Sequence, residues 1–210
     1  MLELTLVPLK DELTALPWVE RYGGIARPLR IYTEGTETYK LYPIRKGLTH
    51  DQCHRQARYT DLIPDSRYAN LLYSEIQQHP TERPSTVKGR NMVMMESKVR
   101  LVYWLNLAKM GKTQDGSEVT AGRIGKELIS TLIGMAKLTD GSTVEYLGFT
   151  NIVSDPAIFS PYDYPQSIGA LMLYPYDFGA VDFTVRHHFT GGCDTPMALE
   201  TPIECVTDWG

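Results

Sequence analysis

Residues 97–107 (SKVRLVYWLNL) carry the strongest strand pattern in the chain. Successive side chains of a strand point to opposite faces of a sheet. One face of this segment carries Val99, Leu101, Tyr103 and Leu105, and the other carries Lys98, Arg100, Val102 and Trp104. Residues 180–189 alternate in the same way, with Val181, Phe183, Val185, His187 and Phe189 on one face and Asp182, Thr184, Arg186 and His188 on the other. We therefore expect the chain to fold around a sheet.

Four shorter β-rich segments, at 29–33, 38–44, 69–77 and 143–153, bring the expected number of strands to about six. Residues 34–37 are typical of a hairpin loop between the first two. Pro43 lacks a backbone N–H group, which favours a place at an edge of the sheet.

One main amphipathic helix is predicted at residues 119–138. Its apolar side chains recur at helical spacing and form one stripe: Ile124, Leu128, Ile129, Leu132, Ile133 and Met135. A short helix is expected at residues 8–16, where Pro8 suits the first turn and Leu9, Leu13 and Leu16 share a face. Strands without regular helices between them predict an α+β fold, with a largely antiparallel sheet packed by one main helix.

The 210 residues suit one α+β domain over residues 1–192. Within it, residues 49–96 are interpreted as a long, loop-rich insert. Thr49 could cap a short helix at 49–63, or this segment could equally be a loop. Residues 193–210 show no periodicity and are expected to form an extended C-terminal arm. The apolar runs are far shorter than the roughly 20 residues of a membrane span, and no signal peptide is recognisable.

Charge is distributed unevenly along the chain, whose formal net charge is −4. Residues 1–112 hold 17 basic and 12 acidic side chains, whereas residues 113–210 hold 4 basic and 13 acidic ones. This asymmetry fits a subunit with a positive and a negative side that packs head to tail in a ring. It fits equally well two halves that interleave in space, so that their charges offset one another.

No metal or cofactor site is expected. The metal-binding residue types are His50, Cys53, His54, His187, His188 and Cys193. They lack the paired short spacings of a structural zinc site, and adjacent histidines on a strand point to opposite faces. The three cysteines, Cys53, Cys193 and Cys205, are odd in number and widely spaced, which favours reduced thiols over a disulfide framework.

Catalytic patterns are weak as well. The pairs Cys53–His54 and Cys193–His188 have the residue types of a thiolate and its base, but adjacent residues on a strand do not meet. Gly111, Lys112 and Thr113 resemble the end of a phosphate-binding loop, yet Asn106 stands where its first glycine belongs. The carboxylates considered as pairs are Asp61 with Asp65 and Asp163 with Asp177, and turn chemistry alone explains such residues. The sequence therefore carries no strong catalytic motif.

Basic residues cluster in a polar, proline-bearing stretch at residues 79–91 (HPTERPSTVKGRN), which is predicted to be a loop or extended arm. Arg83, Lys88 and Arg90 of this loop are the candidate DNA-facing or partner-facing residues, because exposed cations attract phosphate without regard to sequence. A second cluster consists of Arg55, Arg58 and Arg67.

The segments PLKDELTAL, SKVRLVYWLN, IGKELISTLIGMA and FSPYDYPQSIGALMLYPYDFGAVDFTVRHHF follow one another in this order. Their organisation resembles that of the neck and tail-completion (tail terminator) proteins of tailed phages, most closely in YPYDFGAVDFTVRHHF. The resemblance implies a non-catalytic virion subunit, assembled in the bacterial host cytoplasm into a homo-oligomeric ring. Such a ring caps the tail tube or joins it to the head–tail connector, contacts adjacent neck or tail proteins, and lets DNA pass through its lumen. The type of ring stays open, as does an equivalent protein of a contractile injection system.

Two other classes of function remain as alternatives. The first is a small cytosolic hydrolase that uses Cys53 or a His/Asp site, which predicts a concave pocket and a titratable group with a perturbed pKa. The second is a carbohydrate- or peptide-binding module, whose contact surface would be built from the 13 tyrosines.

Overall fold

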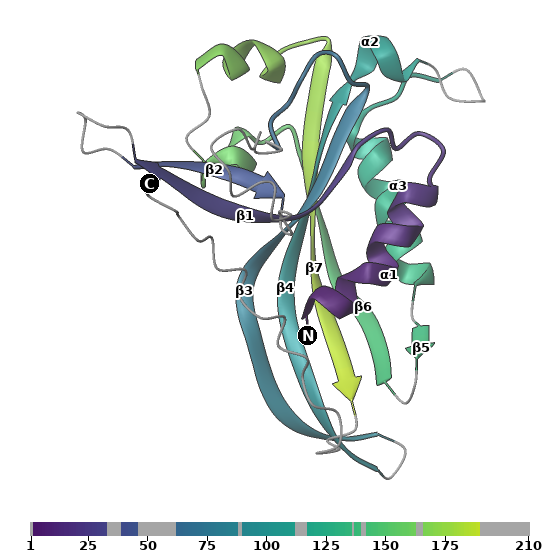
Figure 1. Ribbon diagram of the computed structural model, residues 1–210. Coiled ribbons are helices and arrows are strands. Elements are labelled where there is room, and N and C mark those ends of the chain that lie inside the picture. Colours follow the sequence, from purple (N-terminus) through teal and green to yellow (C-terminus); the bar gives the residue numbers. More distant parts are fainter. Residues whose placement is uncertain are drawn as a thin grey trace, which may run out of the picture.

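One seven-stranded sheet organises the protein, as the computed structural model shows (Figure 1). The structure describes residues 2–32, 39–45, 62–87, 90–111, 117–135, 137–139, 142–162 and 166–189. The strands are β1 (Tyr22–Tyr32), β2 (Tyr39–Arg45), β3 (Asn70–Val87), β4 (Arg90–Asn106), β5 (Lys137–Thr139), β6 (Ser142–Val153) and β7 (Tyr176–Phe189). The helices are α1 (Leu2–Ala15), α2 (Leu107–Met110) and α3 (Ala121–Gly134), with short 3₁₀ helices η2 (Pro156–Phe159) and η3 (Gln166–Met172). The predicted α+β class is confirmed.

The strand order is β2-β1-β3-β4-β7-β6-β5. All neighbouring strands are antiparallel except β1 and β3, which are parallel. The two segments with the clearest alternation, β4 and β7, lie at the centre and pair continuously from Val93↔Phe189 to Asn106↔Tyr176. Strand β2, which contains Pro43, lies at an edge as predicted.

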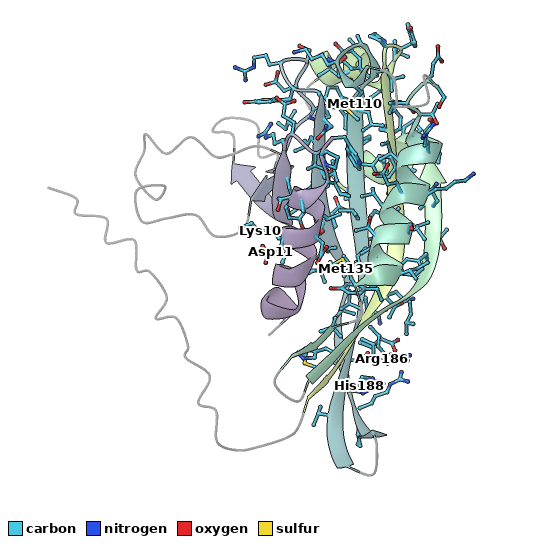
Figure 2. The ribbon with its side chains drawn as sticks, turned by 90° about the vertical axis from the view of Figure 1, so that its right-hand side faces the viewer. Lys10, Asp11, Met110, Met135, Arg186 and His188 are labelled. Atoms are coloured by element: carbon cyan, nitrogen blue, oxygen red, sulfur yellow. The ribbon has the colours of Figure 1, made fainter. Side chains whose placement is uncertain are left out.

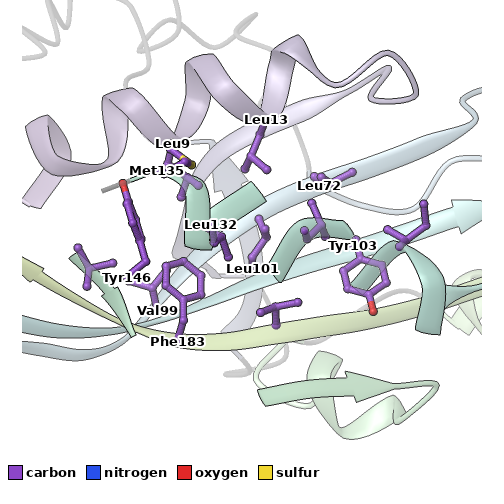
Figure 3. Packing of buried hydrophobic residues seen from close by; sticks show 14 of the residues in the cluster. Leu9, Leu13, Leu72, Val99, Leu101, Tyr103, Leu132, Met135, Tyr146 and Phe183 are labelled. Atoms are coloured by element: carbon purple, nitrogen blue, oxygen red, sulfur yellow. The ribbon is translucent and has the colours of Figure 1, made fainter. Parts of the chain in front are cut away.

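Helices α1 and α3 lie side by side on one face of the sheet, here called the helical face (Figures 1 and 2). Figure 3 shows leucines of α1 and α3 packed over the strands. The buried residues of this cluster include Leu9, Leu13, Leu128 and Leu132 from the helices and Val99, Leu101, Tyr103, Leu105, Val181 and Phe183 from β4 and β7. Full burial of a leucine side chain contributes about 1.5–3 kcal/mol, so these side chains hold both helices on the sheet.

The opposite face of the sheet has its own apolar cluster, at the end where β4 finishes. Val102 and Trp104 of β4 lie here, on the face that the alternation assigned to them. Leu62, Ile158 and Phe159 cover them. The Trp104 indole N–H donates to the carbonyl oxygen of Leu171 at 2.8 Å, which satisfies its buried polar group.

Polar contacts hold the N-terminus of α3 against the sheet. Thr120 is the N-cap residue, and its hydroxyl accepts a hydrogen bond from the backbone N–H of Arg123. The Asp177 carboxylate, at the start of β7, accepts one from the N–H of Ala121 at 2.7 Å. Gly125 faces the Asn151 side chain of β6 so closely that a Cβ atom there would overlap it. The glycine therefore permits α3 to approach the sheet.

Several sequence-based boundaries need correction. Helix α1 begins at Leu2 and not at Pro8, so one missing N–H group does not stop the helix. Helix α3 ends at Gly134, and residues 137–139 form the edge strand β5. None of the described helices is long and apolar enough to cross a membrane.

The largest correction concerns the loop-rich insert predicted at residues 49–96. Residues 70–87 and 90–96 belong to β3 and β4, the two longest strands, which pair as a hairpin down to Val87↔Arg90. Proline is tolerated in β3 because the outer edge of this strand pairs with β1 only around Leu72 and Ser74. Residues 49–61, the hairpin loop at 34–37 and the C-terminal arm at 193–210 lie outside the described residues.

Candidate functional site

A strip of charged and polar side chains crosses the opposite face of the sheet, next to the apolar cluster. Strand register places its members in rows across β3, β4, β7 and β6. The rows are Glu75, Arg100 and Asp182; then Lys98 and Thr184; then Glu96, Arg186 and Glu145. We call these residues, together with Gln77, the polar strip. Alternation with a period of two puts them all on the face opposite α1 and α3.

The first row is held together by a bidentate ion pair. Nε and Nη2 of Arg100 donate to the two carboxylate oxygens of Asp182 at 2.7 and 2.8 Å. Parallel hydrogen bonds of this kind are stronger and more directional than a single one. The charge of Asp182 is therefore offset within the strip.

Glu75 is the most buried charged residue of the strip, with 4% of its surface exposed. Burial raises the pKa of its carboxyl group, while a hydrogen bond from Tyr162, the charge of Arg100 and a hydrogen bond from Gln77 oppose that shift. The Gln77 amide donates to Oε2 at 3.0 Å, whereas the buried Oε1 has no hydrogen-bond partner in the described part of the chain. A buried carboxylate oxygen without a partner is costly, which agrees with the upward direction of the pKa shift.

A hollow of about 340 Å³ opens beside this row. It is lined by Gln77, Lys98, Val99, Gly148, Asp182, Phe183 and Thr184. The register between β6 and β7 shifts between Leu147 and Thr150, and Gly148 has a φ of 66° in this bulge. A Cβ atom at Gly148 would meet only the Thr184 hydroxyl, at 4.0 Å. The bulge and its glycine therefore leave space where a regular strand would place a side chain.

Lys98 and Thr184 lie directly opposite each other on β4 and β7, at this hollow. Lys98 is exposed. Neither side chain makes a hydrogen bond or ion pair within the residues that the structure describes. The hollow therefore presents one ammonium group and one hydroxyl group that are available to a ligand.

The last row forms an ion-pair network at the lower end of the sheet, where Figure 2 shows Arg186 and His188. Arg186 lies 3.1 Å from Glu96 on β4 and 3.6 Å from Glu145 on β6. Nε2 of His188 lies 3.9 Å from the same Glu145 carboxylate. These pairs are partly exposed, so they contribute less to stability than to the alignment of the three strands.

The strand order shows how the basic and acidic halves of the sequence are placed in the sheet. Arg100 and Glu96 belong to the basic first half of the chain, and their partners Asp182 and Arg186 belong to the acidic second half. The strands of the first half, β2, β1, β3 and β4, lie together on one side of the sheet, and those of the second half, β7, β6 and β5, lie on the other. The two halves therefore meet at the β4–β7 pair and do not interleave within the sheet. The ion pairs across this border offset part of the charge there, while each half of the sequence keeps its own side of the sheet.

The predicted basic loop is not assembled as expected. Arg83 is exposed, but it lies within β3 and pairs in register with Met94 of β4. Arg90 is the first residue of β4, and Lys88 lies outside the described residues. The loop prediction was wrong for residues 79–87, because antiparallel pairing with β4 extends the strand through polar residues.

The other candidate residues fall into two groups. His50, Cys53, His54, Arg55, Arg58, Asp61, Asp163, Cys193 and Cys205 lie outside the described residues. Within them, His187 and His188 occupy opposite faces of β7 as predicted, and no three His, Cys, Asp or Glu residues of this part are grouped to hold a metal ion. Asp65 pairs with Arg67, whose hydrogen bond lowers the pKa of the Asp65 carboxyl group.

Sequence reasoning missed the grouping of Glu75, Arg100 and Asp182. A polar residue in an otherwise apolar alternation marked each position, at Glu75 in residues 69–77 and at Arg100 and Asp182 in the two central strands. The sequence does not reveal the strand register that places Glu75, Arg100 and Asp182 in one row. No protein-family model matches this chain, and no curated protein sequence is similar enough to count as a match.

Proposed function

We propose that this protein is a structural virion protein that forms rings in the neck or tail of a tailed phage, in a tail terminator or head–tail connector role. It acts by assembly around the DNA channel and not by catalysis. The proposal starts from the organisation of the sequence described above. It places the protein in the virion, in contact with copies of itself and with adjacent neck or tail proteins.

The single observation that carries the proposal is the β3–β4 hairpin. Its pairing continues past Val93, the last residue of β4 that pairs with β7, to Val87↔Arg90 (Figure 1). Thr81, Arg83 and Pro84, which lead into this part of β3, are exposed. A two-stranded hairpin is marginally stable on its own in water, so an arm of this kind gains stability by packing on a neighbour.

Solution mass tests the proposal most directly. We expect multi-angle light scattering of the purified protein across concentration to give one mass that is a fixed multiple of 23.7 kDa. Negative-stain images of the same sample should show closed rings. A strict monomer at every concentration, or open aggregates without a fixed copy number, would contradict self-assembly into a ring.

The hairpin arm supplies a matched test. Arg83→Glu changes an exposed side chain at the base of the arm, whereas Lys10→Glu makes the same change in charge on an exposed position of α1. We expect Arg83→Glu to weaken ring formation and Lys10→Glu to leave it unchanged. If the two variants assembled equally well, the arm would not take part in the contact between subunits. Loss of binding of Arg83→Glu to double-stranded DNA in an electrophoretic shift, with assembly intact, would assign Arg83 to DNA instead.

A further inference from the structure

We infer that the hollow beside Lys98 is a subunit contact, in which Lys98 and Thr184 receive a carboxylate side chain of a second copy of the chain. This inference rests on the ring-forming function proposed above and gives that ring one specific contact. It differs from the hairpin contact, because the hollow lies at the Gly148 bulge of β6 and not on the arm.

The charges around the hollow leave one cation without an acidic partner. Arg100 is bound to both oxygens of Asp182, and it also faces Glu75. The ammonium group of Lys98 has no acidic partner in the described part of the chain. Thr184, directly opposite, adds a hydroxyl donor. An incoming carboxylate would therefore meet a charge-assisted hydrogen bond from Lys98 and a second bond from Thr184.

The hollow is also large enough for such a side chain. Its volume of about 340 Å³ exceeds the space of a single carboxylate group, so the adjoining methylene groups and backbone of a neighbour can enter with it.

A second copy of the chain is the occupant that charge complementarity favours. Residues 113–210 carry 13 acidic and only 4 basic side chains. One of these carboxylates, on Glu118, is exposed and makes no ion pair among the described residues. Glu118 precedes Val119, which packs in the helical-face cluster, whereas Lys98 lies on the opposite face. A carboxylate on one side and its receptor on the other are what a head-to-tail ring contact requires.

Charge reversal at the hollow tests the inference with the full-length protein. Lys98→Glu would place like charges together, and we expect it to raise the protein concentration needed for half-maximal assembly by at least about tenfold. The matched control is Lys126→Glu, which makes the same change in charge at an exposed position of α3. We expect this control to stay within about twofold of the wild-type concentration.

A milder variant separates loss of the contact at the hollow from a general effect of the acidic side chain that Lys98→Glu introduces. Thr184→Val keeps the shape of the side chain and removes only the hydroxyl, and we expect a rise of about fivefold in the same concentration. Circular dichroism should show unchanged secondary structure for all three variants. If the wild-type protein forms rings and Lys98→Glu assembles as well as Lys126→Glu, this inference is overturned and the ring function stands. A wild-type protein that never assembles would overturn both.

Discussion

The hydroxyl of Tyr103 lies 2.9 Å from the carbonyl oxygen of Ala121, which joins the central strand β4 to the first residue of α3. The same hydroxyl lies 3.0 Å from Oδ1 of Asn151 on β6. Asp177 on β7 accepts from the Ala121 N–H group at 2.7 Å. Strands β4 and β7 thus hold the N-terminus of α3 directly, and Asn151 on β6 contacts the Tyr103 hydroxyl that takes part. The position of the helix is set by these contacts as well as by its leucines.

Tyr103→Phe tests this anchor. The change leaves the ring in place but removes the buried hydroxyl and its two contacts, so we expect the free energy of unfolding to fall by about 1–2 kcal/mol. Urea denaturation followed by circular dichroism measures it. Tyr146→Phe is the matched control, because the buried Tyr146 hydroxyl has no hydrogen-bond partner within the described residues. Equal losses in the two variants would show that the Tyr103 contacts carry no stability.

Two glycines of α3 should respond in opposite directions to alanine. Gly125→Ala places a methyl group against the Asn151 side chain, so we expect a loss of about 1–3 kcal/mol in spite of the better helix propensity of alanine. Gly122 has nothing within 4 Å of its added Cβ atom. Gly122→Ala should therefore stabilise the protein by about 0.5–1 kcal/mol. The midpoints of urea unfolding compare the pair, and a gain for both variants would mean that α3 can move off β6.

Adjacent residues of α3 separate its buried side from its exposed side. Leu132 is fully buried, whereas Ile133 is 63% exposed. Leu132→Ala should lower the free energy of unfolding by about 2–5 kcal/mol through lost burial and the cavity left behind. Ile133→Ala should change it by no more than about 0.5 kcal/mol. If Leu132→Ala unfolds the chain outright, Leu132→Val gives the measurable intermediate case.

Glu75 makes stability depend on pH. Burial raises the pKa of its carboxyl group in the folded protein above the ordinary value of about 4.5. The folded state therefore disfavours the ionised form. The stability that the protonated Glu75 carboxyl group contributes is fully present below about pH 4.5 and is lost as the pH rises through the folded pKa. Glu75→Gln removes the titration, and we expect it to stabilise the protein more at pH 7 than at pH 4.

Thermal unfolding at pH 4 and pH 7 measures that difference. Glu96→Gln is the matched control, because Glu96 is half-exposed and paired with Arg186 at 3.1 Å. We expect no greater benefit at pH 7 for this control. A benefit of Glu75→Gln that is the same at both values of pH would rule out the carboxyl group as the source.

Strands with strict alternation were the easiest elements to predict. The assignment of Val99 and Leu101 to one face and of Val102 and Trp104 to the other is confirmed by the two apolar clusters. Residues 79–87 were misread, because polar residues and prolines are typical of loops and the pattern contains no signal for a partner strand. In the structure β4 pairs with this part of β3 and supplies its strand hydrogen bonds.

The candidate site was beyond sequence reasoning for a related reason. Glu75 and Asp182 are separated by more than a hundred positions, and each meets Arg100 only because β3 and β7 flank β4 in one register. A shift of that register by one residue would send these side chains to the helical face. The hollow likewise depends on the bulge at Gly148, which a lone glycine in a β-rich segment does not reveal.

The sequence by itself determined the α+β class, the two central strands with the faces of their apolar side chains, and the amphipathic helix, although Ile133 of the predicted apolar stripe is exposed. These properties follow from periodicity, which is local and needs no knowledge of distant residues. Only the tertiary structure decided the strand order, the length of the β3–β4 hairpin, the meeting of the two charged halves at the β4–β7 pair and the row that joins Glu75, Arg100 and Asp182. These features depend on which segments pair, and pairing is settled by burial and hydrogen bonding between residues far apart in the chain.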